Sequence, residues 1–313
     1  MNASICLNIL RDLIQQDIAH RGLGKDPASN LLNHVPDDFA DACTSIAAHP
    51  NPHLAVVTGF FIADAVPPSA ETDGPLGAVF LQRALAYLGI PVVILTDSFC
   101  IQAVRAGLNA AGQDETSAQI LSDLIDNQAN ALSEAWDKLF HERAITHLVA
   151  LERVGPASDQ KCYSMRGIDI SSFMYPAEHL FDRARAGRLT TIGIGDGGNE
   201  IGMGKIPASI IARNIPRGDL IACRTATDYL IVAGISNWGA YALASGIAYL
   251  LKKPLPSSFF EHEAEYRILT NMIEQGSLVD GVTKLPQATV DGIDFERYIQ
   301  ILTACGQHTR NDK

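Results

Sequence analysis

Short apolar runs alternate with helical patterns along most of this chain, and this alternation restricts the fold more than any other feature. Five such runs are each followed by turn residues and then by a helical pattern: His53–Thr58, Pro91–Thr96, Thr146–Leu151, Thr191–Ile194 and Tyr229–Ala233. Near-continuous apolar runs of this length are typical of parallel strands buried on both faces and joined by helices. We therefore predict an α/β fold, a mostly parallel doubly wound sheet of about five or six strands flanked by helices. Residues 1–313 are expected to form a single domain.

The helical patterns differ in how clearly their ends are marked. Pro75–Leu88 begins with a proline suited to a first turn and is followed by Gly89, a common helix terminator. Thr116–Phe140 predicts a long helix. The segments Asn30–Pro50 and Ser257–Asp291 are expected to be small peripheral helical or hairpin additions.

Charge and cysteine usage exclude several classes of protein. The formal net charge is −11 and no run of Lys or Arg occurs, which argues against a nucleic-acid partner. The six cysteines show no CxxC spacing, which argues against a zinc knuckle or a disulfide framework and favours a reducing compartment. The N-terminal segment carries Asp12 and Asp17 and reads as an amphipathic helix, not as a signal peptide. We therefore expect a cytoplasmic protein.

One uncharged stretch, Tyr229–Leu251, is long enough to span a bilayer. However, Gly234, Asn237 and Gly239 cluster at its middle, where a strand would turn into a helix. A buried strand followed by a buried helix explains the stretch better than a membrane span, so no membrane partner is expected.

Polar residues follow each predicted strand where it ends. They are Glu71-Thr72-Asp73-Gly74 after the first strand, Asp97 after the second, Glu152-Arg153 after the third, Asp196 to Glu200 after the fourth and Ser236-Asn237 after the fifth. Parallel strands bring their carboxyl ends to the same edge of a sheet, where ligands bind in open α/β folds. The sequence therefore predicts one site rich in carboxylates.

The glycine-rich stretch GIGDGGNEIGMGK, residues 193–205, contains the G-x-G-x-x-G spacing of dinucleotide sites. Asp196 would stand where a pyrophosphate must approach, and no acidic ribose partner follows about twenty residues later. No nucleotide cofactor is therefore expected. Asp196 and Glu200 suit a cation or a substrate ammonium group, and the alternative is a structural turn with exposed acids.

Four further residues are candidates, and two of them, Asp73 and Arg166, have a plain structural alternative. Asp73 could bind a ligand or cap the helix that follows it, whereas capping does not explain Glu71. Arg166, beside a glycine, could bind a substrate carboxylate or pair with Asp169. Asn237 stands at a helix entry and is expected to face the site.

The order of the motifs adds a resemblance. TGF, ETDGPLGA, ILTD, LERVGP, MRGIDIS, GIGDGGNEIGMGK and LIVAGISNWGAYAL occur in the order seen in the D-glutamate cyclase family. Over about residues 10–300 the chain resembles the C-terminal catalytic-type domain of that family, in a stand-alone bacterial form. Animal members of the family resemble mitochondrial proteins with an additional N-terminal domain, and we expect neither that domain nor a targeting segment in this chain.

The resemblance implies a lyase that interconverts D-glutamate and 5-oxo-D-proline plus water, so the expected partner is a small-molecule substrate. Our hypothesis for its chemistry places a Mg²⁺ or Mn²⁺ ion, or the substrate ammonium, on Asp196 and Glu200 together with Glu71 or Asp73. Glu152 would be the base or a further ligand, and Arg166 would bind the α-carboxylate. The remaining candidate substrate contacts are Gly197, Gly198, Asn199 and Asn237.

Two other functions stay open on the sequence. A Mg²⁺- or Mn²⁺-dependent phosphohydrolase also uses clustered acids at the end of a sheet, and Asp97 stands where a phosphate-accepting aspartate would. A non-catalytic small-ligand binding module is the other option, and a homo-oligomeric state stays open. A dianionic substrate in an acidic site further requires a cation, or Arg153 and Arg166 turned inward.

Overall fold

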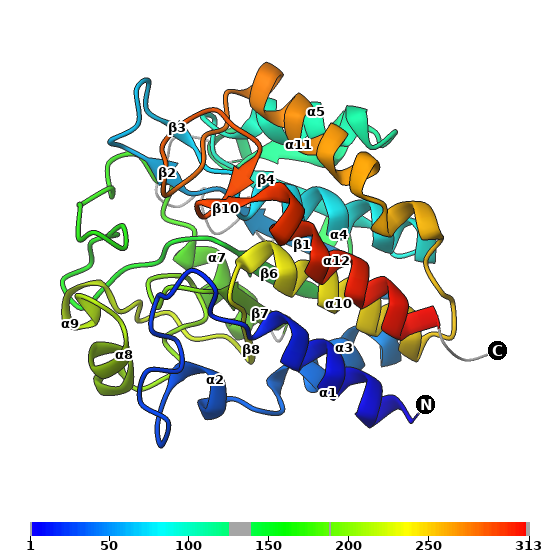
Figure 1. Ribbon diagram of the computed structural model, residues 1–313, viewed down its shortest axis with the longest axis horizontal. Coiled ribbons are helices and arrows are strands. Elements are labelled where there is room, and N and C mark those ends of the chain that lie inside the picture. The colour runs from blue at the N-terminus through cyan, green and yellow to red at the C-terminus, as the bar shows by residue number, and fades with distance from the viewer. Residues whose placement is uncertain (1, 125–138, 188, 311–313) are drawn as a thin grey trace.

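The computed structural model describes residues 2–124, 139–187 and 189–310. Its centre is a six-stranded sheet in which all neighbouring strands are parallel (Figure 1). In chain order the strands are β1 (Leu54–Thr58), β4 (Val92–Thr96), β5 (Ala118–Ile120), β6 (His147–Leu151), β7 (Thr190–Gly195) and β8 (Tyr229–Val232). Across the sheet they lie in the order β5-β4-β1-β6-β7-β8, so the direction of winding reverses between β1 and β6. Such a reversal opens a crevice at the carboxyl ends of the two strands.

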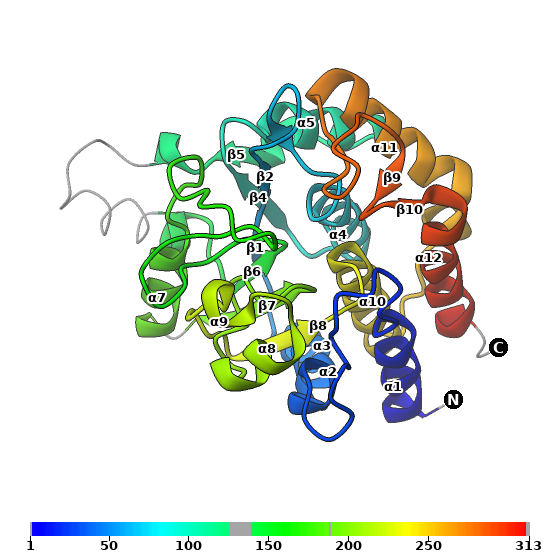
Figure 2. The same cartoon turned by 60° about the vertical axis from the view of Figure 1, so that its left-hand side comes forward.

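The central strands β1, β4 and β6 each contribute side chains to two cores, which explains why their sequences are almost continuously apolar. In β1, Leu54 and Val56 pack into the larger core and Ala55 and Val57 into the smaller one on the opposite face. The larger core is covered by α1 (Ala3–Ile14), α3 (Asp38–Ala48), α4 (Pro75–Leu88), α5 (Ile101–Ala110), α10 (Ser236–Leu250), α11 (His262–Gly276) and α12 (Phe295–Arg310). The other face is covered by α2 (Leu31–His34), α7 (Glu178–Ala186), α8 (Ala208–Asn214) and α9 (Gly218–Ile221). Figure 2 shows α7 and α10 on opposite sides of the sheet, and the doubly wound prediction is confirmed.

The long uncharged stretch divides as its glycines suggested. It forms β8, a turn and α10, and α10 is buried along nearly its whole length because it packs against α1, α3, α4 and α12. A helix surrounded by other helices needs apolar residues on every side. Among the described residues, no helix is long and apolar enough to cross a membrane.

Two of the predicted segments differ from the structure. Residues 115–120 form a 3-10 turn, η1 (Glu115–Ser117), and strand β5, whereas the sequence predicted a helix over Thr116–Phe140. The strand forms because its backbone pairs with the edge of β4, so that a tertiary contact overrides the local helical pattern. The part of that prediction over residues 125–138 lies outside the described residues.

The segment Ser257–Asp291 is more than a peripheral addition. After η3 (Ser257–Phe260), α11 packs along α5 and buries Ile268 and Met272 in the larger core. The chain then forms a small hairpin of β9 (Thr289–Val290) and β10 (Ile293–Asp294), and another short hairpin, β2 (Phe61–Ile62) with β3 (Ser69–Ala70), follows β1.

Candidate active site

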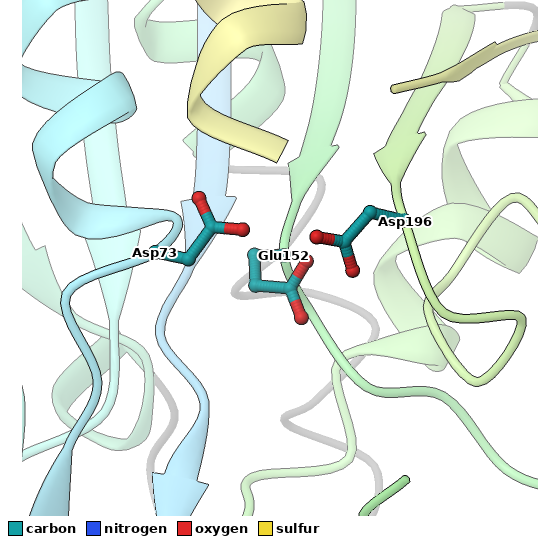
Figure 3. Close-up of side chains that lie close together, drawn as sticks. All are labelled: Asp73, Glu152 and Asp196. Atoms are coloured by element: carbon teal, nitrogen blue, oxygen red, sulfur yellow. The ribbon is translucent and has the colours of Figure 1, made fainter. Parts of the chain in front are cut away.

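Three buried carboxylates meet at the carboxyl edge of the sheet. Asp73 lies in the segment between β1 and α4, Glu152 follows β6 and Asp196 follows β7. One carboxylate oxygen from each residue lies within 4.8 Å of the others, and Figure 3 shows the three side chains turned toward one another. All three are at most 4% exposed. The convergence predicted from the strand ends therefore exists at the β1–β6 switch point.

Asp73 and Asn237 each cap the helix that the other introduces. The Asp73 carboxylate accepts the N–H groups of Ser236 and Asn237 at the start of α10, at 2.9 and 2.8 Å. The Asn237 Oδ1 in turn accepts the N–H groups of Gly74 and Gly77 at the start of α4, at 2.8 and 2.7 Å. Asp73 therefore does act as a helix cap, chiefly of the distant helix α10, and its Oδ1 also accepts the N–H of Gly74 just ahead of α4 at 3.0 Å. The sequence suggested that Asn237 faces the site. In the structure its amide oxygen instead caps α4.

Replacing Asn237 tests this reciprocal cap. Asn237→Ala leaves the Gly77 N–H at the buried start of α4 without its acceptor and removes one of the two acceptors of the Gly74 N–H, so the free energy of unfolding is expected to fall by about 1–3 kcal/mol. Denaturant unfolding measures this loss. Ser245→Ala on the same helix is the matched control, because the buried Ser245 hydroxyl has no hydrogen-bond partner in the structure and its removal is expected to cost less than about 0.5 kcal/mol. Equal losses in the two variants would contradict the cap.

The glycine-rich loop after β7 folds around its own glutamate. The Glu200 carboxylate accepts the N–H groups of Asp196, Gly197 and Gly198 at 2.9, 2.6 and 2.7 Å. Gly198 has a φ of 95°, which favours glycine. The loop therefore binds an anion, but that anion is an internal side chain. This corrects our expectation that Glu200 faces a cation or ammonium and that the Gly197 and Gly198 amides contact substrate.

Two side-chain oxygens in the same loop can still accept a hydrogen bond. The Asn199 amide nitrogen donates to the Tyr163 carbonyl at 2.8 Å, whereas its Oδ1 is buried without a hydrogen-bond partner in the structure. The Oδ2 of Asp196 is likewise buried and has no hydrogen-bond partner among the described residues. Buried oxygens without donors are costly, and in a native structure they commonly mark a place for a ligand, an ion or water.

Two residues that the sequence did not single out complete the site. Arg21, from the loop between α1 and α2, contacts the Oδ1 atoms of Asp196 and Asp291 at 2.7 and 2.6 Å. Asp291 and Gly292 form the two-residue turn between β9 and β10, with φ values of 55° and 75°. An Asp-Gly pair between two short apolar runs is a strong hairpin signal that could have located this turn. The sequence around Arg21 contains no comparable motif.

The charges of the site do not balance without protons or a further cation. Five carboxylates (Glu71, Asp73, Glu152, Asp196 and Asp291) surround the guanidinium of Arg21. Burial and the repulsion between these groups raise the pKa values of Glu71 and Glu152 well above the ordinary range. The same burial raises the pKa of Asp196, although Arg21 opposes the shift, and raises the pKa of Asp73 to about 7. The carboxylates raise the pKa of Arg21 despite its burial.

The raised pKa values predict that stability falls as pH increases. The folded protein keeps protons that the unfolded chain releases near pH 4, so the unfolding free energy decreases with pH up to and beyond about pH 7. Burial lowers the pKa of His147 to about 4, which acts in the opposite direction below about pH 6.5. Denaturant unfolding in EDTA should therefore give a stability lower at pH 8.5 than at pH 6.5 by on the order of 1–2 kcal/mol. A stability that rises over this interval would contradict the charge assignment, and Asp196→Asn is expected to reduce the slope.

A cavity of about 170 Å³ opens onto these residues. Its lining includes Arg21, Glu71, Glu152, Met165, Arg166 and Asp291. Two larger hollows lie at the opposite edge of the sheet, beside the first residues of β7 and β8 and of β1 and β4. Because ligands of open α/β sheets bind at the carboxyl ends of the strands, we assign the site to the smaller cavity.

Two other predicted groups have different surroundings from those expected. Arg153 is fully buried and pairs with Asp97, so neither side chain is turned toward the carboxylate cluster. Arg166 is 45% exposed at the rim of the cavity, where it donates to the carbonyl of Val282 at 3.3 Å and lies 4.0 Å from Asp64. It does not pair with Asp169, which contacts Lys161.

Backbone geometry marks Glu152 as well. Its φ of 44° lies in the left-handed region, which non-glycine residues rarely adopt and which is enriched at functional sites. The Ser236 hydroxyl donates to Glu152 Oε2 at 2.6 Å and thereby fixes the carboxyl group between Asp73 and Asp196.

Comparison with known proteins agrees with the order of motifs. A family model described as "D-glutamate cyclase-like, C-terminal" matches residues 10–305. The mitochondrial D-glutamate cyclase of Homo sapiens is 32% identical over 301 residues, which cover 87% of this chain and 48% of the human protein. The chain thus spans about half the length of this curated relative. From the extent of the family match, the chain belongs to the D-glutamate cyclase-like family, in the part that its model describes as C-terminal.

Proposed function

We propose that this protein is a hydro-lyase that interconverts D-glutamate and 5-oxo-D-proline plus water by intramolecular lactam formation. The observation that carries the proposal is the meeting of Asp73, Glu152 and Asp196 beside a cavity of about 170 Å³ in a chain of this family. A cavity of this size suits a small amino acid better than a nucleotide or a polymer. The similarity to a protein named D-glutamate cyclase supports the choice of substrate.

The reaction needs a base, an acid and control of position. The substrate ammonium loses a proton, and the free amine attacks the γ-carboxyl carbon. The nitrogen then loses a second proton as the C–N bond forms, and one γ-oxygen leaves as water after gaining two protons. The atoms balance, and the steps require groups that hold protons near neutral pH. Folding the substrate so that the amine reaches its own γ-carbon contributes through proximity.

Glu152 is the residue we assign to proton transfer. It lies between the other two acids, and the Ser236 hydroxyl fixes one of its oxygens at 2.6 Å. Burial and the neighbouring Glu200 and Asp73 raise its pKa, so the carboxyl group can accept a proton from the amine and return it to the leaving oxygen. Glu71 lines the same cavity with a raised pKa, and in its protonated form it would donate a hydrogen bond to an anionic substrate. This lowers the repulsion that a dianion would otherwise meet.

The donor set also fits a hard divalent cation. Asp73, Glu152 and Asp196 would hold Mg²⁺ or Mn²⁺, since each offers a carboxylate oxygen and the Oδ2 of Asp196 is buried without a partner. Glu152 takes the place in this set that the sequence assigned to Glu200. When bound, such an ion supplies the positive charge that neutralises the γ-carboxylate and makes its carbon electrophilic.

Purified protein incubated with each enantiomer of glutamate and of 5-oxoproline tests the reaction and the ion together. The primary amine is expected to disappear from D-glutamate or appear from 5-oxo-D-proline, with the L-enantiomers inactive. EDTA should abolish turnover, and Mn²⁺ or Mg²⁺ should restore it and raise the melting temperature of the metal-free protein. Turnover of D-glutamate that survives chelation would keep the reaction and remove the ion.

The same preparation separates the other two functions. Mn²⁺-dependent release of phosphate from a phosphate monoester, without lactam formation, would favour a phosphohydrolase. The burial of Asp97 against Arg153 gives no support to that function. Saturable binding of 5-oxoproline without any turnover would identify a binding module.

A further inference from the structure

Arg21 reaches the site from outside the strand ends, on a rigidly held N-terminal loop. The Asp17 carboxylate accepts the N–H groups of Arg21, Gly22 and Leu23 at 2.8, 2.8 and 3.0 Å. The loop is also packed against the body of the protein, because a Cβ on Gly22 would lie 2.4 Å from the carbonyl oxygen of Asn214. The position of the Arg21 side chain is therefore set by backbone contacts and not only by its charge partners.

The guanidinium keeps donors free on the cavity side. Its two terminal nitrogens each contact one aspartate, Asp196 and Asp291, which fixes the plane of the group. Of its five N–H donors, one is hydrogen-bonded to Asp196 and the contact with Asp291 is an ion pair, and among the described residues no further protein acceptor bonds the group. The side chain is 14% exposed and lines the cavity together with Glu71 and Glu152. A fixed guanidinium with unused donors is suited to bind a carboxylate.

We propose that Arg21 binds the α-carboxylate of the substrate, an inference that rests on the proposed function and names the residue that selects its substrates. The α-carboxylate is present in both D-glutamate and 5-oxo-D-proline, so one fixed cation would serve both directions of the reaction. Arg21 lies among the acids that would otherwise repel this group. Arg166, which the sequence suggested for this role, is an exposed rim residue that donates to main-chain carbonyls.

Binding of a matched pair of ligands tests the assignment without relying on turnover. The pair is 5-oxo-D-proline and its primary carboxamide, which share the ring and differ in the carboxylate. Isothermal titration of the wild-type protein should show the acid binding about 30-fold or more tightly than the amide, because two charge-assisted hydrogen bonds are at stake. Arg21→Gln is expected to remove most of this preference by weakening the acid alone. Arg166→Gln is the matched control and should keep the preference.

A second variant guards against misfolding of Arg21→Gln. Arg21→Lys keeps a positive charge beside both aspartates but loses the planar fork, so it is expected to fold and to bind the acid about 10-fold more weakly. A wild-type protein that binds the acid no more tightly than the amide would overturn the assignment. An Arg21→Lys protein with undiminished preference, or loss of the preference in Arg166→Gln instead, would also overturn it. If the preference depends on Arg21 but D-glutamate is not turned over, the proposed reaction fails while the carboxylate site stands.

Discussion

Glu152→Gln is expected to lower kcat for D-glutamate by about 10³-fold while the protein stays folded. Glutamine has nearly the same shape, and its amide oxygen can still accept the Ser236 hydroxyl that holds Glu152 at 2.6 Å. It cannot exchange a proton with the substrate amine or with the leaving oxygen. The substitution also removes one of five crowded carboxyl groups, so the melting temperature is expected to be unchanged or higher. Initial rates at saturating substrate and thermal unfolding measure the two effects.

Glu265→Gln is the matched control for this variant. Glu265 is also a fully buried glutamate, but it pairs with Arg83 at 2.8 Å and accepts the Tyr241 hydroxyl at 2.8 Å, away from the cavity. Breaking this pair should lower the free energy of unfolding by about 3 kcal/mol with little change in kcat of the folded protein. Glu152→Gln is thus expected to lower kcat without loss of stability, and Glu265→Gln to lower stability with little change in kcat. A kcat for Glu152→Gln within tenfold of the wild type would remove Glu152 from proton transfer.

Arg21→Met is expected to lower the free energy of unfolding by about 3–5 kcal/mol at pH 7.5 in the absence of divalent ions. Methionine replaces much of the side-chain volume, but Asp196 and Asp291 lose the cation that each contacts within 2.7 Å. The loss should shrink at pH 5.5, because the Asp196 carboxyl group, whose pKa burial already raises, then takes up a proton in place of the missing charge. Denaturant unfolding at both pH values measures this difference.

A double variant that removes both Arg21 and the charge of Asp196 provides the control. In the double variant Arg21→Met with Asp196→Asn, one of the two uncompensated carboxylates is gone, so part of the lost stability should return at pH 7.5. Mn²⁺ should also stabilise Arg21→Met if Asp73 and Glu152 hold the ion with Asp196. A loss that is the same at both pH values, and that the second substitution leaves unchanged, would show that Arg21 acts through packing alone.

The strand-end acids were the part of the site most accessible to sequence reasoning. Asp73, Glu152 and Asp196 each follow an apolar run, and parallel pairing forces those positions to one edge of the sheet. Glu71, which the sequence placed with these acids, lines the same cavity as Glu152. The sequence did not reveal in which direction the other polar side chains near these strand ends point. Glu200 and Asn237 carry the same kinds of side-chain oxygen as the residues of the cluster, but backbone N–H groups of the glycine-rich loop and of the start of α4 occupy them.

The excess of acidic residues at the strand ends also carried information about their partner. Several buried carboxylates cannot share a site without a cation or protons, so the sequence implied a positively charged partner. The arginines beside the motifs, Arg153 and Arg166, were the natural candidates. In the structure Arg153 neutralises Asp97, and Arg21 takes the central position from a loop with no motif of its own.

By itself the sequence determined the parallel sheet, the limits of α4 and the gathering of acids at one edge. These follow from periodicity and from the geometry of parallel strands, which are local or topological properties. Only the tertiary structure decided which polar groups face the cavity and which cap helices, and which distant segments supply Arg21 and Asp291. The physical reason is that hydrogen-bond satisfaction and charge balance depend on which backbone groups and side chains meet in space, and spacing along the chain does not encode that meeting.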